Sequence, residues 1–274
     1  MSARVHCGRH TFELTRPLVM GVVNVTPDSF SDGGSFLDRA RALKHARQLI
    51  ADGADLIDIG GESTRPGAPS VSVDEEIERV LEVVDVLARE GVAVSVDTRK
   101  AAVMRAAIGA GAAMINDVSA LADAGALAAC AASDVGVCLM HMRGEPATMQ
   151  EAPAYNDVVA EVGAYLRARV EACLAAGIAQ ERIVVDPGFG FGKSLPHNLA
   201  LMRALPIFAA TAPVLAGLSR KSMLGAITGR PVGERVAASV AAALAAVAHG
   251  AAIVRVHDVR ETVDALKVWA ALND

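Results

Sequence analysis

Residues 54–98 hold an apolar run "ADLIDIGG" (54–61), an amphipathic stretch "VDEEIERVLEVVDVLAREG" (73–91) and a second apolar run "VAVSVDT" (92–98). The two runs are short and rich in Val and Ile, which is typical of strands buried on both faces of a parallel sheet. The middle stretch repeats apolar residues at helical spacing and ends in a glycine, so it predicts a helix. Together the three segments predict a strand–helix–strand unit with parallel strands.

The same pattern recurs along the chain, before and after this stretch. The remaining apolar runs are "LVMGVVN" (18–24), "AAMINDV" (112–118), "VGVCLMH" (135–141), "RIVVDPG" (182–188), "PVLAGLS" (213–219) and "AAIVRVHD" (251–258). About eight strand–helix units in 274 residues predict a (β/α)8 TIM barrel, whereas a doubly wound sheet would use fewer units and leave room for a second domain. We therefore expect one domain over residues 1–274. The leading segment "RVHCGRHTFEL" (4–14) predicts a short β-hairpin at the bottom of the barrel.

Composition excludes several classes of protein. Hydrophobic residues make up 53% of the chain and aromatic residues 3%, so the core must consist mainly of aliphatic side chains. A net charge of -5 argues against a general nucleic-acid binder. We find no signal peptide and no stretch apolar enough to span a membrane. The four cysteines form no C-x-x-C pair, so we expect reduced thiols and a cytoplasmic protein.

Polar side chains stand at the ends of the predicted strands, where the active site of an α/β barrel lies. Asp97, Asn116 and Asp186 are hydrogen-bond acceptors or amides, which suit a flat heterocycle that displays N–H groups. Cations and donors form a second group, consisting of Arg65, Arg255 and His257, and suit a phosphate. Asn24 offers an oxygen ligand for Mg²⁺, which usually binds few protein groups together with substrate phosphates. These residues predict a substrate with a nitrogen-rich ring at one end and phosphate at the other.

Other motifs fail on inspection. The segment "PGFGFGKS" (187–194) has proline where a phosphate-binding P-loop needs glycine. Its glycines instead predict a loop that lies against a flat ligand, with Phe189 or Phe191 packed nearby. Lys221 lies in a hydrophilic "SRKS" segment, so we expect it to hydrogen-bond and place charge rather than form a Schiff base. Three potential ligands in the hairpin, His6, Cys7 and His10, lack a fourth, and we predict no metal site there.

Two long segments and six short ones resemble the dihydropteroate synthase family of pterin-binding enzymes. The long segments are "MGVVNVTPDSFSDGG" (20–34) and "GADLIDIGGESTRPG" (53–67). The short ones, in the family's order, are "SVDT", "INDV", "LMHM", "DPGFGFGK", "GLSRKS" and "RVHDV". The resemblance covers essentially the whole chain.

The resemblance implies three adjoining subsites. Asp97, Asn116, Asp186 and Lys221 would bind the pterin ring, with Met140 beside it. Asn24, Arg65, Arg255 and His257 would hold a diphosphate, and Asn24 would also touch Mg²⁺. Thr64, Pro66, Phe189 and Ser222 would line the p-aminobenzoate side, where sulfonamides compete. Lys221, Arg255, His257 and Asp97 are the expected catalytic residues.

The implied reaction condenses 6-hydroxymethyl-7,8-dihydropterin diphosphate with p-aminobenzoate to give 7,8-dihydropteroate and diphosphate. Our hypothesis is a dissociative displacement through a pterin cation, because cations surround the expected leaving group and carboxylates surround the ring. We also expect residues 26–34 to form a lid hinged at Gly33 and Gly34, in which Phe30 covers the p-aminobenzoate side. Asp28 and Asp32 would bring negative charge to the site, and Ser29 lies between Asp28 and Phe30.

Two other interpretations stay open. A pterin-dependent methyltransferase barrel would share the ring pocket but has no diphosphate to hold, and a non-catalytic paralogue would bind without turnover. The Ala-rich stretch "ERVAASVAAALAAVAHG" (234–250) permits close helix packing, either on the barrel or between two chains. The family resemblance favours a homodimer.

Overall fold

The computed structural model describes residues 4–25, 35–63, 70–145, 148–151 and 153–273. Within them the strands are β1 (Arg4–Cys7), β2 (His10–Glu13), β3 (Leu18–Asn24), β4 (Leu56–Gly60), β5 (Val94–Asp97), β6 (Met114–Asp117), β7 (Gly136–Met140), β8 (Ile183–Asp186), β9 (Val214–Ala216) and β10 (Ala251–Val256). The helices are α1 (Ser35–Ala51), α2 (Val73–Arg89), α3 (Ala101–Gly109), α4 (Ala126–Ala131), α5 (Val158–Ala175), α6 (Leu195–Arg203), α7 (Leu205–Ala209), α8 (Ser222–Thr228), α9 (Val236–Ala248) and α10 (Val259–Asn273).

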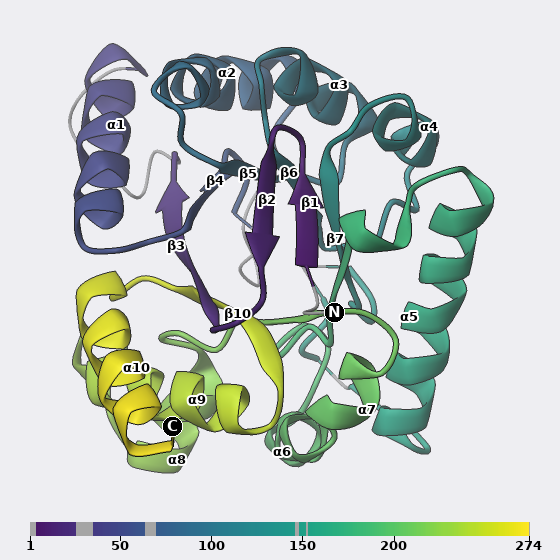
Figure 1. Cartoon of the computed structure of the whole chain (residues 1–274). Helices are drawn as coiled ribbons and strands as arrows, with labels where there is room; N and C mark the ends of the chain where they lie inside the picture. The colour runs from purple at the N-terminus through teal and green to yellow at the C-terminus, as the bar shows by residue number, and fades with distance from the viewer. Residues whose placement is uncertain (1–3, 26–34, 64–69, 146–147, 152, 274) are drawn as a thin grey trace.

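Strands β3 to β10 form a closed parallel barrel in chain order, with β10 paired to β3. The helices surround this ring (Figure 1), because α1 to α9 lie in the crossovers between neighbouring parallel strands and α10 follows the last strand, β10. The predicted (β/α)8 barrel is therefore confirmed, including the strand–helix–strand unit β4–α2–β5.

Helix α2 shows how the sequence determines a local element. The Ser72 side chain accepts a hydrogen bond from the backbone N–H of Glu75, and three acidic residues occupy the first turn, where they oppose the positive end of the helix dipole. One apolar face, which includes Val80, Val84 and Leu87, is buried against the barrel. Capping and amphipathic spacing thus agree, and the helix begins and ends close to where the sequence predicts.

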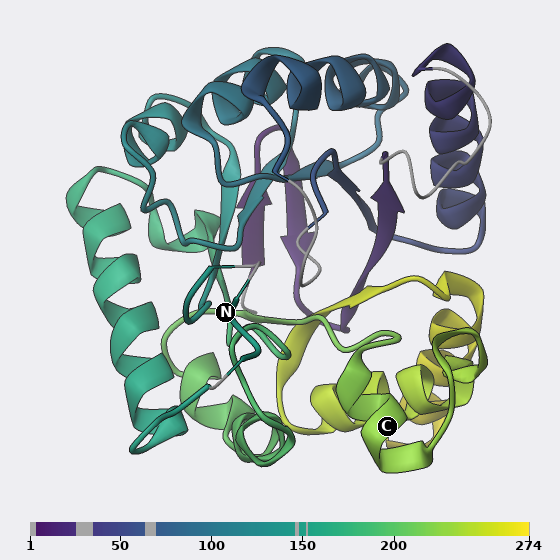
Figure 2. The same ribbon diagram turned by 180° about the vertical axis from the view of Figure 1, so that it is seen from behind.

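The β1–β2 hairpin closes the bottom of the barrel. Val5 and Cys7 of β1 belong to the same buried cluster as Leu18, Leu56 and other side chains near the beginnings of the barrel strands. The hairpin lies in front of the ring in Figure 1 and behind it in Figure 2. Gly136 permits this packing, since a β-carbon there would lie 2.8 Å from the Cys7 Sγ. The predicted hairpin at the barrel bottom is confirmed.

Side chains alternate along each barrel strand. In β4, Leu56 belongs to the cluster inside the barrel, whereas Ile57 and Ile59 belong to the larger cluster between the strands and the helices. The period of two then directs Asp58 inward. The same alternation turns the polar residues near the carboxyl ends of β5, β6, β8 and β10 into the mouth of the barrel.

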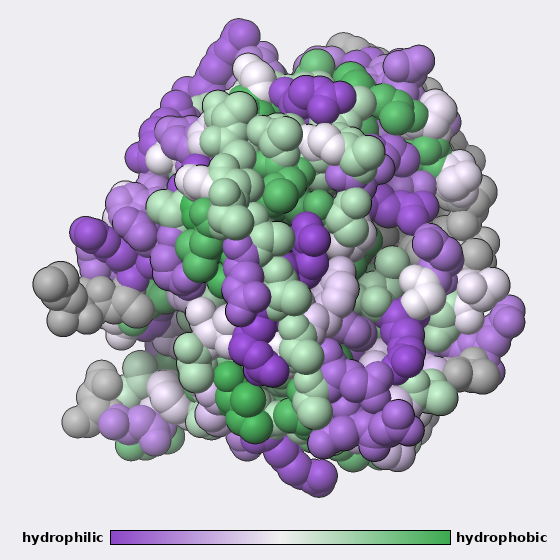
Figure 3. All heavy atoms as spheres, turned by 90° about the vertical axis from the view of Figure 1, so that its right-hand side faces the viewer, coloured by the Kyte–Doolittle hydropathy of each residue, from purple (hydrophilic) through white to green (hydrophobic). Residues whose placement is uncertain are grey.

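The outer surface mixes hydrophilic and hydrophobic residues (Figure 3), as expected for amphipathic helices packed on a barrel. In the described part of the chain, no helix combines the length and apolarity needed to cross a membrane.

Candidate active site

A largely buried hydrogen-bonded network joins four strands at the mouth of the barrel. The Arg255 guanidinium on β10 donates from Nε to the Asp58 Oδ2 of β4 at 2.6 Å, and from Nη2 to the Asp97 Oδ2 of β5 at 2.9 Å. Asn116 on β6 donates from Nδ2 to the same Asp58 oxygen at 3.1 Å. Asp58 is fully buried. Sequence segments up to 197 positions apart therefore meet in one hydrogen-bonded group.

Burial and crowding change the acid–base properties of this group. Burial raises the pKa of Asp97 to about 7, against the lowering effect of Arg255 and with a further rise from the Asp58 charge. The pKa of Arg255 is raised, because the two carboxylates outweigh the effect of its burial. Arg255 therefore stays protonated, while Asp97 titrates near neutral pH.

A second acid–cation pair lies on the other side of the mouth. Asp186 at the end of β8 is buried and accepts a hydrogen bond from the Gly188 N–H at 2.7 Å. Burial raises its pKa, and the charge of Lys221 opposes that rise. Burial in turn lowers the pKa of Lys221 to about 8, against the effect of Asp186. The polar "SRKS" segment does not indicate this lowering of the pKa, because the residues that desolvate the Lys221 side chain come from other parts of the chain.

Residues 187–192 form a tight loop against the tip of β7. Gly188 and Gly192 have positive φ angles, and a β-carbon at either would overlap a backbone carbonyl oxygen, that of His141 or of Arg143. The Lys221 Nζ donates to the Phe189 carbonyl and lies 4.8 Å from the centre of the Phe191 ring. The loop therefore supports Lys221, whereas the contact with a flat ligand that the glycine spacing predicts stays a prediction.

The two phenylalanines of this loop have different roles. Phe189, which we expected on the p-aminobenzoate side, is fully buried and packs in the core between the strands and the helices. Phe191 is half-buried and contacts Lys221. Sequence alone does not distinguish them, because both lie between glycines in a repeated Gly-Phe pattern. The burial of Phe189 argues against direct ligand contact.

The remaining predicted residues lie around this centre. Met140 is buried at the end of β7, Ser222 is exposed as the first residue of α8, and Asn24 is half-buried at the end of β3. His257, just after β10, approaches the Ser219 Oγ through both its backbone N–H, at 3.2 Å, and its Nδ1, at 3.0 Å. Seven predicted residues lie outside the described part of the chain: Asp28, Ser29, Phe30, Asp32, Thr64, Arg65 and Pro66.

Asp58 is the residue that the sequence interpretation left without a role. Its signal was present, because an aspartate between Ile57 and Ile59 in a parallel strand must point into the barrel. The buried Lys193 was also missed; its Nζ contacts the His141 Nδ1 at 3.0 Å and the Phe191 carbonyl at 2.9 Å. Burial lowers its pKa to about 7.

The closed barrel, with acidic and basic side chains gathered at the carboxyl ends of its strands, defines the architecture of an α/β-barrel enzyme. A profile of the pterin binding enzyme family matches residues 20–257. The chain is 56% identical to the dihydropteroate synthase of Neisseria meningitidis serogroup B, covering 97% of this chain and 96% of that protein. The chain belongs to this family and, within it, to the dihydropteroate synthases, which are transferases.

Solved structures agree with this assignment. Dihydropteroate synthase from Xanthomonas albilineans with 4-aminobenzoic acid superposes with a TM-score of 0.94 at 52% identity, covering 100% of this chain and 99% of that one. The Yersinia pestis enzyme in a sulfonamide drug complex gives a TM-score of 0.93 at 48% identity, covering 98% and 99%.

Proposed function

We propose that this chain condenses 6-hydroxymethyl-7,8-dihydropterin diphosphate with p-aminobenzoate to form 7,8-dihydropteroate and diphosphate. The observation that carries the proposal is the buried group of acceptors, Asp97, Asn116 and Asp186, set beside two cations, Lys221 and Arg255. A pterin displays N–H donors along one edge, which such acceptors bind. Membership of the dihydropteroate synthases supports the same substrates.

The pterin subsite is built from Asp97, Asn116, Asp186 and Lys221, with Met140 beside the ring. Asp186 and Asn116 are nearly fully buried and are already held in place by hydrogen bonds to Gly188 and Asp58, so their remaining acceptor capacity is presented to a ligand in a fixed geometry. Arg255 keeps the carboxylates of Asp58 and Asp97 oriented through its two hydrogen bonds. Ring binding therefore exchanges water at a prearranged set of acceptors for the N–H groups of the pterin.

The diphosphate subsite combines Asn24, Arg65 and His257 with Arg255. Asn24 and His257 lie at the ends of the neighbouring strands β3 and β10. Gly60 lies opposite Asn24 on the neighbouring strand and has no side chain. Even a β-carbon there would lie 3.6 Å from the Asn24 Oδ1, so this oxygen has room beside it for a ligand.

The family implies Mg²⁺, and the donors present fit an ion that arrives with its substrate. The described residues hold no group of three or more His, Cys, Asp or Glu side chains placed to bind a metal. An amide oxygen from Asn24 together with diphosphate oxygens matches the way Mg²⁺ is usually bound. When bound, the ion would supply positive charge to the departing diphosphate.

The p-aminobenzoate subsite lies on the Lys221 side of the mouth. Ser222 and the ring of Phe191 adjoin Lys221 there, and we assign the stacking contact to Phe191 while Phe189 supports the loop from the core. Thr64 and Pro66 would complete this side, and residues 26–34, with Phe30, would cover it. Sulfonamides would compete here, in keeping with the drug complex of the Yersinia pestis enzyme.

In the mechanism, the protein stabilises charge and orients two substrates. The C–O bond between the pterin methylene and the diphosphate breaks, and the leaving electron pair stays on diphosphate beside Arg255 and His257. The carboxylates of Asp97 and Asp186 lower the energy of the pterin cation. The p-aminobenzoate nitrogen then forms the C–N bond with the methylene carbon and loses a proton to water. Lys221, whose pKa is lowered to about 8, donates a hydrogen bond to the pterin ring. Its ammonium group places positive charge between the two substrates.

Diphosphate release, measured with and without p-aminobenzoate and Mg²⁺, tests the function. Release that requires p-aminobenzoate and yields dihydropteroate supports the synthase. A cobalamin-dependent methyl transfer without diphosphate would favour the methyltransferase. Binding of the substrates without turnover would favour the non-catalytic paralogue. Positional isotope exchange in the diphosphate, in the absence of p-aminobenzoate, supports the dissociative path. A complete lack of exchange under all conditions would favour a concerted one.

Three further assignments belong to this proposal. The chain acts as a single domain, since one continuous cluster runs around the barrel. We place it in the cytoplasm, where its four buried, unpaired cysteines would stay reduced.

We also propose a homodimer. Ile207, Ile227 and Val232 are more than half exposed on the segment from α7 to the turn before α9. Sedimentation analysis would report the mass of the particle in solution.

A further inference from the structure

A strained backbone conformation precedes Lys221. Arg220 has a φ of +59°, in the left-handed region that favours glycine. A residue with a β-carbon is strained in this conformation, so the surrounding structure must hold it. Arg220 separates Ser219, which contacts His257 at 3.0 Å, from Lys221 and Ser222. The direction of this turn therefore determines where Lys221 and Ser222, two side chains of the proposed site, point.

Helix α9 and the residue before it hold the Arg220 turn from outside the barrel. The Ser239 Oγ accepts the Arg220 N–H at 2.9 Å and donates to the Arg235 carbonyl at 2.7 Å, so both functions of the hydroxyl are used. Ser239 is 2% exposed. Its removal would leave the Arg220 amide buried without an acceptor.

The Arg235 guanidinium holds the same turn through the backbone carbonyls of Arg220 and Lys221. Nη1 donates to the Arg220 carbonyl at 3.0 Å and approaches that of Lys221 at 3.4 Å, while Nε donates to the Arg230 carbonyl at 2.9 Å. Gly225 in α8 leaves room for this group, because a β-carbon there would overlap it. The planar guanidinium carries several N–H donors in a fixed fork, so it bonds the Arg220 and Arg230 carbonyls at the same time. A lysine ammonium, a single point donor, cannot reach both.

The Arg220 side chain adds a link to the next strand end. Its guanidinium pairs with Asp258 through two hydrogen bonds, of 2.5 and 3.1 Å. The turn after β9 is thereby tied to the residues that follow β10, including His257. Amide, carbonyl and side chain of Arg220 are each held by a different partner.

We infer that Arg235 and Ser239 are positioning residues of the proposed synthase, which act by holding the left-handed turn at Arg220 and so directing Lys221 and Ser222 into the mouth of the barrel. Neither is among the residues assigned to a substrate. The inference rests on the proposed function, because the turn has a catalytic consequence only if Lys221 and Ser222 meet substrate. Without the two anchors the turn relaxes toward right-handed conformations, and the path of the next two residues changes.

The test compares Ser239→Ala with Ser133→Ala, which also removes a hydroxyl that donates to a backbone carbonyl (Cys130, 3.0 Å) and accepts a backbone N–H (Val135, 3.4 Å). Ser133 lies in the turn before β7, at the opposite end of the barrel strands from the site. Both variants should lose similar unfolding free energy in urea. Only Ser239→Ala should lower kcat/KM, by about tenfold, with KM for p-aminobenzoate rising more than kcat falls. Faster hydrogen exchange of the Arg220 amide should accompany that loss.

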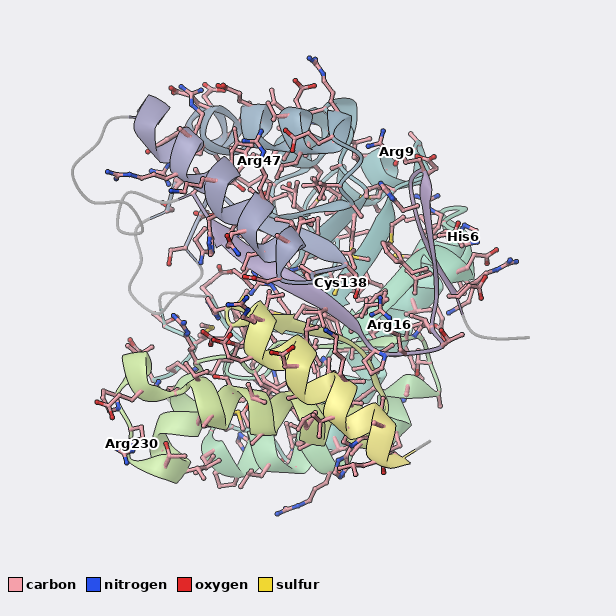
Figure 4. All side chains as sticks on the ribbon, turned by 60° about the vertical axis from the view of Figure 1, so that its left-hand side comes forward. His6, Arg9, Arg16, Arg47, Cys138 and Arg230 are labelled. Atoms are coloured by element: carbon pink, nitrogen blue, oxygen red, sulfur yellow. The ribbon has the colours of Figure 1, made fainter. Side chains whose placement is uncertain are left out.

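Arg235→Lys is the second variant, in case Ser239→Ala folds poorly, and Arg230→Met is its control. Arg230 lies at the outer edge of the molecule (Figure 4) and its side chain pairs only with Glu234 among the contacts described. We expect Arg235→Lys to lower kcat/KM about tenfold and Arg230→Met to leave it unchanged.

Strain itself is tested in an Arg220→Gly background, since glycine adopts the left-handed conformation freely. There the penalty of Ser239→Ala on kcat/KM should shrink to about twofold or less. Unchanged kcat/KM in both Ser239→Ala and Arg235→Lys would overturn the inference, as would an undiminished penalty in the glycine background. A wild-type chain without turnover would instead contradict the proposed function, and the exchange rate of the Arg220 amide would still report whether the anchors hold the turn.

Discussion

Replacing Asp58 by asparagine perturbs the centre of the buried charge network while keeping its shape. Asp58 Oδ2 accepts from Arg255 at 2.6 Å and from Asn116 at 3.1 Å, while its Oδ1 is buried with no hydrogen-bond partner. In the variant, the amide oxygen can keep the Oδ2 position. The amide N–H₂ must then occupy the Oδ1 position, which has no hydrogen-bond partner in the wild type.

The magnitude follows from the lost charge. Breaking a buried ion pair typically costs about 3–5 kcal/mol, but Arg255 retains Asp97 at 2.9 Å, and a neutral hydrogen bond replaces the charged one. We therefore expect a loss of about 1.5–3 kcal/mol in transition-state stabilisation, or roughly 10- to 150-fold in kcat/KM for the pterin diphosphate. Because the Asp58 charge raises the pKa of Asp97, that pKa should also fall.

The assay is steady-state turnover between pH 5.5 and 8.5, with unfolding free energies measured in urea on the same proteins. Asp117→Asn is the matched control. Asp117 ends β6, two strands along the barrel from β4, and is equally buried, but its oxygens accept from Ser119 and from the Leu121 amide, each at 2.7 Å. We expect the control to lose stability with unchanged kcat/KM. An Asp58→Asn variant with wild-type kcat/KM, or one no worse than the control, would refute the assigned role of Asp58.

Three further predictions concern stability and the loop. The folded-state pKa of Asp97, raised to about 7, lies above its ordinary value near 3.9, so its contribution to stability is present below about pH 4 and lost as pH rises through 7. The unfolding free energy of the wild type should fall relative to that of Asp97→Asn by up to about 4 kcal/mol between pH 4 and 8, and a constant difference would contradict this. Phe191→Ala should raise KM for p-aminobenzoate about fivefold with little loss of stability, whereas Phe189→Ala should cost about 3–5 kcal/mol of unfolding free energy; the reverse pattern would exchange their roles. Gly188→Ala should lose about 2–4 kcal/mol, while Gly233→Ala, which meets nothing within 4 Å, should stay within about 0.5 kcal/mol by urea titration.

Two features of the site show where sequence reasoning ends. The role of Asp97, Asn116 and Asp186 as acceptors could be predicted, because each ends a predicted strand and the barrel topology brings strand ends together. The pairing of Arg255 with Asp58 and Asp97 could not be predicted, since the two hydrogen bonds join residues 197 and 158 positions apart. The charge of Arg255 predicts a place among the phosphate-binding residues. Only the fold shows that this charge also balances the carboxylates of Asp58 and Asp97 beside the pterin subsite.

The sequence by itself determined the barrel, its hairpin and the family. Local pattern is sufficient for these, because the period of apolar residues, the helix caps and the strand-end motifs are all encoded within a few neighbouring residues. The tertiary structure alone decided which phenylalanine of "GFGFG" is buried, how far burial lowers the pKa of Lys221, and what holds the left-handed turn at Arg220. Burial and charge–charge distance depend on segments that meet only after folding, so no local pattern records them.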